Sequence, residues 1–199
     1  MSIKVSKRQG TRKKSVLREW IESILIAFVL AMVIRAFIVQ AFRIPTGSMR
    51  TTLLEGDIIL VNKFIYGAKV PFTNFRLPAI RQPGRGDVVV FIYPENPKKD
   101  FIKRLIAAAG ETVEIKNGTV YVNNSALVGP VFNRIYYYNR GEFGQEGRKI
   151  VVPQGHFFVM GDNSASSQDS RYWGFVPAQN ILGAAMVIYW PPQRIRIIK

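Results

Sequence analysis

The sequence Thr-Val-Glu-Ile-Lys-Asn-Gly-Thr-Val-Tyr-Val-Asn at residues 112–123 decides the fold class. Both of its halves are rich in β-branched residues, and Asn117-Gly118 between them is a strong hairpin signal, because a type I′ turn needs positive φ at both central residues. Asn117-Gly-Thr and Asn123-Asn-Ser also match glycosylation acceptors, but the turn interpretation accounts for the flanking runs as well. The segment predicts an antiparallel pair of strands.

Four further runs of the same kind are separated by Gly, Pro and Asn, and they comprise residues 57–64, 87–93, 156–161 and 181–190. There is no internal repeat or low-complexity tract. The segment 124–150, rich in Gly, Asn, Tyr and Arg, is typical of an exposed extended loop. We therefore expect residues 43–199 to form a mainly β domain in which segments distant in sequence pair with one another.

A basic block followed by an apolar stretch precedes this domain. Residues 1–20 carry seven Lys and Arg against one Glu, and residues 24–34 have no polar side chain. If Arg35 reaches the headgroups, residues 20–42 are long enough for a transmembrane anchor. The basic residues 1–19 would then lie in the cytoplasm, with the β domain across the membrane.

Two other interpretations of the apolar stretch exist. A cleavable signal peptide has the same basic and apolar regions, and Val39-Gln-Ala41 resembles a cleavage site. Composition alone favours the anchor and the signal peptide about equally. A buried helix of a soluble protein is disfavoured, because the stretch is apolar all round rather than on one face.

The overall composition limits the chemistry. The chain has 28 Lys and Arg against 13 Asp and Glu, a net charge of +15, so nucleic acid and anionic membrane are both possible partners. It has no cysteine, which excludes disulfides, thiolate zinc sites and cysteine nucleophiles. Because His156 is the single histidine, any histidine-dependent triad would have to use it, and we expect no metal or other cofactor.

The first candidate for chemistry is Ser48, in Ile44-Pro-Thr-Gly-Ser-Met49. Pro45 and Gly47 favour a turn on which a hydroxyl and nearby amides point at a bound group. A serine in such a loop is common, so the signal is weak alone. Thr51 occupies the lysine position of a Ser-x-x-Lys motif, and the flanking residues do not form a Gly-x-Ser-x-Gly elbow.

The second candidate is Lys103, inside the apolar run 101–106. In a strand, Lys103 and Arg104 would point to opposite faces. A buried lysine loses hydration of its charged form, its pKa falls, and the neutral amine can act as a general base. The local pattern alone nevertheless favours a surface lysine, because lysine is seldom fully buried.

The third candidate segment is residues 159–177, where a Gly161-Asp162-Asn163 turn precedes a cluster of short hydroxyl side chains, Asp169 and Arg171. Such a cluster can hold a catalytic amine in a hydrogen-bonded setting. By composition alone it is equally typical of a solvated serine-rich loop.

In this order, the segments resemble bacterial type I signal peptidase (leader peptidase, peptidase S26 family), the membrane-bound Ser/Lys endopeptidase that releases exported proteins from their signal peptides. The motifs that carry the resemblance are Pro45–Met49, Arg85–Phe91, Lys103-Arg104, Gly161–Asn163 and Asp169–Gly174. The resemblance implies a mainly β fold: an N-terminal transmembrane helix, then an antiparallel β-sheet catalytic domain of the signal peptidase and self-cleaving repressor type. It also implies a short inserted β subdomain at residues 112–153.

The resemblance implies a role for each matching residue. Ser48 would be the nucleophile and Lys103 a neutral general base, with the Thr46 hydroxyl and the Ser48 amide as the oxyanion hole. The residues expected to support them are Ser167, which orients the base, the ion pair Asp169 and Arg171, and Gly161 and Asp162. Shallow apolar pockets for the small residues before the cleaved bond are expected near Ile44, Met49 and the strand that begins at Asp87.

The same resemblance implies the partners and the location. The substrate would be the signal peptide of a preprotein. An uncleaved, single-pass anchor in the inner (plasma) membrane would hold the enzyme at the lipid bilayer. No nucleic acid and no obligate protein partner are expected. The chain departs from the family pattern at Thr51, where a proline is usual, and at residues 107–109, where three alanines replace Gly-x-Pro.

Two alternatives remain at this point. A self-cleaving repressor-like protease would share the Ser/Lys pair and the β fold, but it needs a DNA-binding helical domain where this chain has an apolar span. A non-enzymatic membrane protein with a basic surface for anionic lipid or nucleic acid would keep its function after Ser48→Ala and Lys103→Ala.

Overall fold

The computed structural model describes residues 15–70, 73 and 75–198, and the chain divides into two compact units, residues 1–34 and 35–199. Residues 1–14 of the predicted basic block therefore lie outside the described residues. Helix α1, Val16–Val33, begins after Ser15, whose hydroxyl accepts a hydrogen bond from the Arg18 amide. None of its residues is buried.

The helical segment continues past α1 in a π-helical turn, Ile34–Ile38. Within the described residues, Val16–Ile38 is the one helix long and apolar enough to cross a membrane. The anchor predicted from the sequence extends to residue 42, but residues 39–42 belong to strand β1, Val39–Arg43. They form a strand because they pair with β2, and Phe42 packs against the domain core.

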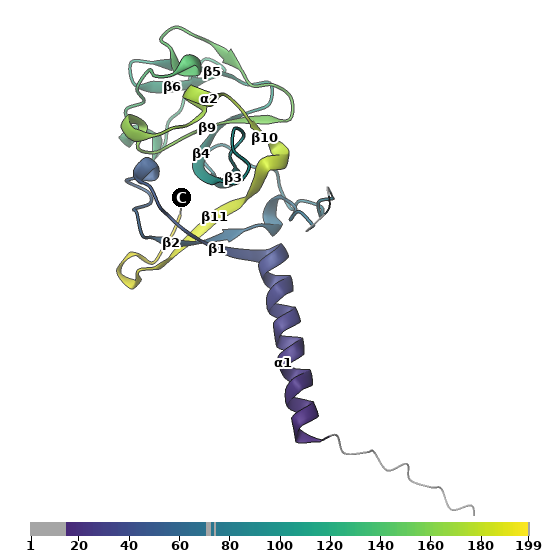
Figure 1. The fold of residues 1–199 in the computed structure, drawn as a ribbon. Coiled ribbons are helices and arrows are strands. Elements are labelled where there is room, and N and C mark those ends of the chain that lie inside the picture. Colours follow the sequence, from purple (N-terminus) through teal and green to yellow (C-terminus); the bar gives the residue numbers. More distant parts are fainter. Residues whose placement is uncertain (1–14, 71–72, 74, 199) are drawn as a thin grey trace, which may run out of the picture. The chain divides into compact units, whose positions relative to one another are not determined.

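Two antiparallel sheets make up the second unit (Figure 1). The larger sheet has the order β1-β2-β11-β3-β4-β9-β10, with β12 on β11, and its remaining strands are β2 Ile58–Asn62, β3 Val88–Ile92, β4 Asp100–Ala108, β9 His156–Met160, β10 Val176–Pro177, β11 Ile181–Trp190 and β12 Arg196–Ile197. The smaller sheet has the order β7-β6-β5-β8, with β5 Thr112–Lys116, β6 Thr119–Val122, β7 Ser125–Ala126 and β8 Ile150–Val151. The short helix α2, Ser170–Trp173, precedes β10.

The predicted mainly β domain behind an apolar helix is confirmed. Strands β2, β3, β9 and β11 lie inside the four predicted runs, and β5 and β6 form the predicted hairpin. Asn117 and Gly118 have φ of 48° and 75°, as its tight turn requires. Strand β4 was not predicted as a whole, because its run of apolar residues lacks alternation.

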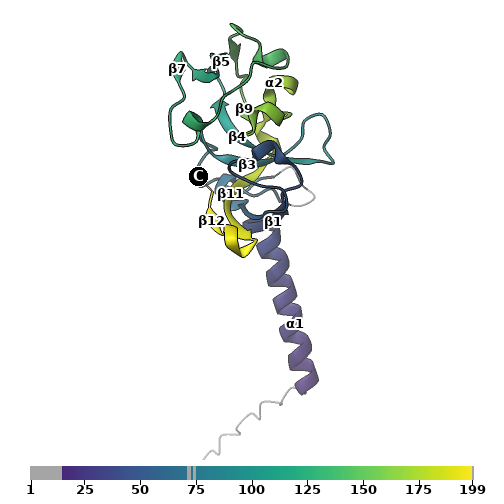
Figure 2. The same cartoon turned by 90° about the vertical axis from the view of Figure 1, so that its left-hand side faces the viewer.

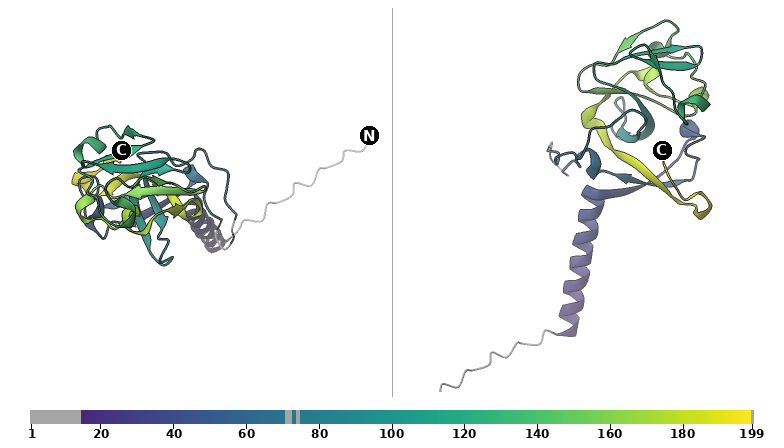
Figure 3. Two further views of the ribbon diagram at one scale, coloured as in Figure 1. Left: turned by 90° about the horizontal axis from the view of Figure 1, so that it is seen from above. Right: turned by 180° about the vertical axis from the view of Figure 1, so that it is seen from behind.

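The position of β11 brings distant parts of the chain together. This long strand pairs with β2 on one side and β3 on the other, and it is the yellow ribbon of Figure 3. Figures 1 and 2 show the smaller sheet at the end of the domain away from β1, β2 and β12. Besides three apolar clusters, the domain buries polar and charged residues on β4, in the loop after β1 and in the segment after β9.

Candidate active site

Ser48 lies in a short 3₁₀ turn, Gly47–Met49, directly after the extended residue Thr46. The loop after β9 holds this turn: the Asn163 amide donates to the Ser48 carbonyl at 3.0 Å, and the Asn163 side chain donates to the Gly47 carbonyl at 2.9 Å. Met49, fully buried, fixes the other end of the turn in the core. The backbone around Ser48 is thus fixed by a segment more than a hundred residues away.

Lys103 reaches Ser48 from β4. Its Nζ lies 2.7 Å from Ser48 Oγ and donates to the Ile102 carbonyl at 3.0 Å. Lys103 is 4% exposed and Ser48 8% exposed, so the local interpretation of a surface lysine is wrong. The structure brings together the two residues that the sequence places 55 positions apart.

The surroundings of Lys103 disfavour its charged form. Burial lowers its pKa to about 8, against the opposing influence of the Asp169 and Asp162 carboxylates, while Arg171 lowers it further. A neutral amine has a lone pair, and this one lies within hydrogen-bond distance of a hydroxyl. The pair can therefore transfer a proton from the serine to the lysine.

Ser167 lies beside the pair. A β-carbon built on Gly161 would collide with Ser167 Oγ on one side and with the Ser48 carbonyl on the other, so the three residues are in close packing. The Ser167 hydroxyl is buried and has no hydrogen-bond partner within the described residues. The structure thus brings Ser167 to the site without joining its hydroxyl to Lys103.

Two buried ion pairs surround the site. Arg104 Nε and Nη2 donate to Asp162 at 2.8 and 2.7 Å, and the Thr52 hydroxyl donates to the same carboxylate. Arg171 Nε and Nη2 donate to Asp169 at 2.8 Å each, and the Gly161 amide donates to Asp169 at 3.0 Å.

The first of these pairs joins β4 to the loop after β9, and the second orders the loop that carries Ser167. Arg104 was missed as a partner of Asp162. Pairing of Arg104 with Met160, two residues before that aspartate, is the signal that would have found it, but strand register is not visible in the sequence.

Arg171 also links the site to the segment between strands β7 and β8 of the smaller sheet. Its Nη1 donates to the Tyr138 carbonyl and to Ser164 Oγ, and its Nη2 donates to the Ser164 carbonyl. Tyr137, the residue before Tyr138, is 2% exposed, although the segment 124–150 was expected to be an exposed loop. It is buried because it packs into the core cluster of β5 and β6.

A cleft of about 300 Å³ opens at Ser48 and Lys103. Its other lining residues are Pro45, Thr46, Asp100, Phe101, Ile102, Ser166 and Gln168. Neither Ile44 nor Met49 lines it, because both are buried in the core, at 2% and 0% exposure. Within the described residues, no group of three His, Asp or Glu is placed to hold a metal ion.

Comparison with known proteins places the chain in a family. A family model described as "Signal peptidase, peptidase S26" matches residues 17–190. The signal peptidase I of Pseudomonas aeruginosa is 34% identical over 217 residues, covering 92% of this chain and 76% of its own. That of Aquifex aeolicus is 35% identical over 228 residues, covering 87% of this chain and 84% of its own.

Among solved structures, a signal peptidase I from Enterococcus faecalis is 34% identical, covers 52% of this chain and 97% of its own, and has a TM-score of 0.44. The family match, residues 17–190, includes every segment that lines the cleft. The chain therefore belongs to the signal peptidase family, peptidase S26, and is a serine endopeptidase that cleaves signal peptides.

Proposed function

We propose that the protein is a membrane-anchored signal peptidase in which Ser48 is the nucleophile and Lys103 the general base. The observation that carries the proposal is the distance of 2.7 Å between Lys103 Nζ and Ser48 Oγ in a buried setting. A protonated lysine has no lone pair to accept the serine proton, so the lowered pKa of Lys103 supports the same role.

The reaction begins when Ser48 Oγ attacks the carbonyl carbon before the cleaved bond and Lys103 takes the hydroxyl proton. The oxygen of the tetrahedral intermediate accepts hydrogen bonds from the Ser48 amide and the Thr46 hydroxyl, which lies on the cleft. Loss of one such donor typically costs about 2.7–4 kcal/mol in transition-state energy.

When the intermediate collapses, the Lys103 ammonium returns the proton to the leaving amine, and the signal peptide stays on Ser48 as an ester. Water then attacks this ester while Lys103 accepts a proton from it. When the bond to Ser48 Oγ breaks, Lys103 returns that proton to Ser48, and the signal peptide leaves with a new carboxylate. The ion pairs Arg104–Asp162 and Asp169–Arg171 hold the loop between β9 and α2 in place during these steps. None of these reaction steps uses a cofactor.

We also propose that Val16–Ile38 is the single membrane span in the inner (plasma) membrane, with the N-terminus in the cytoplasm and residues 43–199 outside it as the catalytic domain. The smaller sheet falls within the inserted subdomain, residues 112–153. The length and apolarity of the helix and the basic residues before it support this topology. An anchor holds the enzyme at the surface where its substrate is embedded, which raises the effective concentration.

The decisive experiment measures cleavage of a preprotein by the full chain in detergent. Ser48→Ala and Lys103→Met should each lose activity by at least about 10³-fold, because neither leaves a complete pair. Ser125→Ala and Lys98→Met change the same residue types at exposed positions and should cleave normally. Cleavage by the two site variants at the rate of the controls would reject the mechanism.

The topology is tested separately on membranes. The full chain should resist extraction by alkaline carbonate, and protease added outside spheroplasts should digest the β domain. Recovery of the chain in the carbonate supernatant would reject the anchor without affecting the assignment of Ser48 and Lys103.

A further inference from the structure

A second cavity, of about 590 Å³, lies outside the catalytic cleft. Tyr66, Lys69 and five residues between 76 and 83 form one wall, and residues 178–181 with Phe157 form the other. The cavity shares no lining residue with the cleft at Ser48. Its size is that of a site for an organic ligand rather than for a lone ion.

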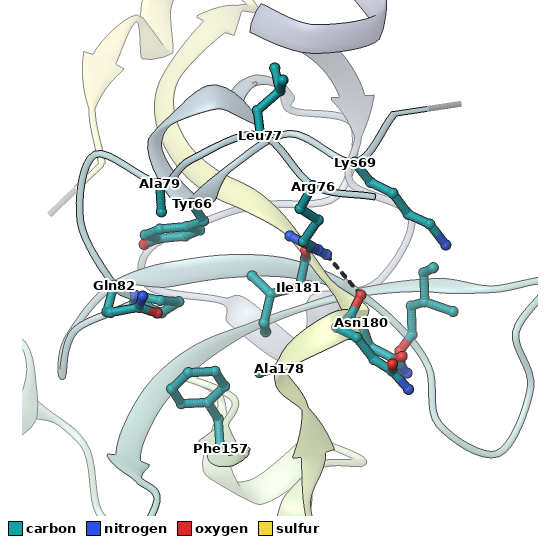
Figure 4. Close-up of a pocket in the computed structure, with 13 residues that line it drawn as sticks. Tyr66, Lys69, Arg76, Leu77, Ala79, Gln82, Phe157, Ala178, Asn180 and Ile181 are labelled. Atoms are coloured by element: carbon teal, nitrogen blue, oxygen red, sulfur yellow. Dashed lines mark hydrogen bonds between the residues drawn. The ribbon is translucent and has the colours of Figure 1, made fainter. Parts of the chain in front are cut away.

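Two cations and no carboxylate line this cavity among the described residues. The cations are Lys69 and Arg76, which are cross-strand partners in an antiparallel bridge. The side chains of two directly paired residues lie on the same face of the bridge, so the side chains of Lys69 and Arg76 are neighbours. Figure 4 draws both beside Asn180, with Tyr66 and Gln82 on the other side of the view.

Arg76 is held in place without being neutralised. Its Nη1 donates to the Gly67 carbonyl at 3.1 Å, and its Nη2 donates to the Gln179 and Ile181 carbonyls at 2.7 and 2.6 Å. Its Nε–H has no acceptor within the described residues. Burial lowers the pKa of Arg76, whereas the more deeply buried Arg104 and Arg171 each have a carboxylate partner. A fixed, half-buried charge of this kind favours an anionic ligand.

Apolar side chains also line the cavity, and they can contact uncharged groups of a ligand beside its phosphate. Tyr66, Phe157 and Ile181 are buried core residues that also face the cavity, and Leu77 joins them from the loop. The cavity therefore matches an anion that carries uncharged groups.

The chain places this cavity near the end of the proposed membrane span. The Lys63 amide donates to the carbonyl of Ile38, the last residue of the apolar helix, at 3.0 Å. Tyr66 is three residues further on, a reach of about 10 Å at most. If the helix is an anchor, as proposed above, the first residue of the cavity wall follows closely on the end of the membrane span.

We propose that this cavity binds the phosphate group of an anionic phospholipid, with Arg76 and Lys69 as its cationic ligands. The phosphate oxygens accept hydrogen bonds from Arg76 Nε and Lys69 Nζ, and the uncharged part of the headgroup packs on Tyr66 and Phe157. The inference rests on the proposed anchoring but not on the Ser48 and Lys103 mechanism.

The test titrates the full chain in nonionic detergent with short-chain phosphatidylglycerol and counts bound lipid by native mass spectrometry. The wild type should retain one lipid. Lys69→Glu should weaken retention at least about fivefold, and Lys69→Arg should restore it. Lys98→Glu makes the same charge change at an exposed lysine outside the cavity and should bind as the wild type does. Equal retention by Lys69→Glu and Lys98→Glu would overturn the proposal.

Arg76→Gln provides a second variant, and thermal unfolding is measured beside it because Arg76 also holds the loop. It should lose the lipid while the β domain stays folded, and retention by a folded Arg76→Gln protein counts against the site. Phosphatidylcholine of the same chain length should bind at least about fivefold more weakly. Equal binding would overturn recognition of an anion.

Inorganic phosphate distinguishes the two sources of the anion. It should fail to displace the lipid at equal concentration, and displacement would identify a free-phosphate site instead. All Lys69 and Lys98 variants should cleave a soluble signal-peptide substrate normally, because neither residue lines the cleft. A failed lipid titration with normal cleavage thus leaves the protease assignment intact.

Discussion

Gly161 faces Ser167 so closely that no other residue fits at its position: a β-carbon there would overlap Ser167 Oγ and the Ser48 carbonyl. The constraint comes from packing, because Gly161 does not have the positive φ that favours glycine. This single missing side chain lets the loop after β9 lie against the turn that carries Ser48.

We predict that Gly161→Ala lowers kcat for preprotein cleavage at least about tenfold, because Ser48 or Ser167 must move away. Gly84→Ala is the matched control, since its β-carbon would meet only ordinary contacts of 3.6 Å or more. Steady-state kinetics on both variants tests this. Equal rates for the two would show that the loop tolerates the shift.

The cleavage rate should depend on the protonation of Lys103. Because burial lowers its pKa to about 8, kcat/KM should rise with pH and level off above that value as the neutral amine becomes dominant. Lys98→Met should give the same profile. A profile flat from pH 6.5 to 9.5 would contradict Lys103 as the base while leaving Ser48 as the nucleophile.

Lys103 should also make stability depend on pH. Its folded-state pKa of about 8 lies below the ordinary 10.5, so the unfolded chain binds more protons between these values, and stability rises with pH across that window. Lys103→Met lacks this group. Chemical unfolding at pH 7 and pH 10 should show the free energy of unfolding of the wild type increasing relative to the variant, and a constant difference would contradict the prediction.

Arg104→Met should destabilise the protein by about 3–5 kcal/mol, because it leaves the Asp162 carboxylate buried with only the Thr52 hydroxyl and no charged partner. Arg148→Met removes an exposed arginine whose ion pair with the Glu142 carboxylate is 3.5 Å and which also donates to the Glu142 carbonyl at 2.7 Å, and it should change stability by less than about 1 kcal/mol. Urea unfolding of both variants gives the comparison. Similar losses of stability in the two variants would show that the buried Arg104–Asp162 pair contributes no more than the exposed Arg148–Glu142 pair.

Thr51 has φ of 85°, a conformation that is strained for a β-branched residue. Thr51→Gly should therefore raise the free energy of unfolding by about 1 kcal/mol. The same change at Thr119, inside β6, removes a strand residue without strain and should lower it by about 1 kcal/mol. Loss of stability in both variants would show that the Thr51 side chain offsets the strain.

Much of the fold was predictable, because it follows from local patterns. The hairpin at Asn117-Gly118 and the alternating strands depend on residues within a few positions of each other. The end of the apolar helix was harder to predict. Residues 39–42 are apolar enough for a membrane span, and only their pairing with β2 makes them a strand.

The site divides in the same way. Ser48 and Lys103 were identified through a resemblance between motifs, whereas the local pattern around Lys103 favoured a surface position. In the folded chain Lys103 contacts Ser48, and Gly161 and Ser167 pack against Ser48 from a third part of the chain. The Arg104–Asp162 pair and the walls of the cleft likewise depend on strand register, which one sequence does not display.

The place of β11 also has a consequence for the newly made protein. Ser48 follows β1 and Lys103 lies on β4, and β11 stands between the β1–β2 pair and the β3–β4 pair although it is synthesised after all four. Sheets closed by such long-range pairing fold slowly. The pair of Ser48 and Lys103 that we propose as catalytic therefore forms only when a segment made late in synthesis completes the sheet.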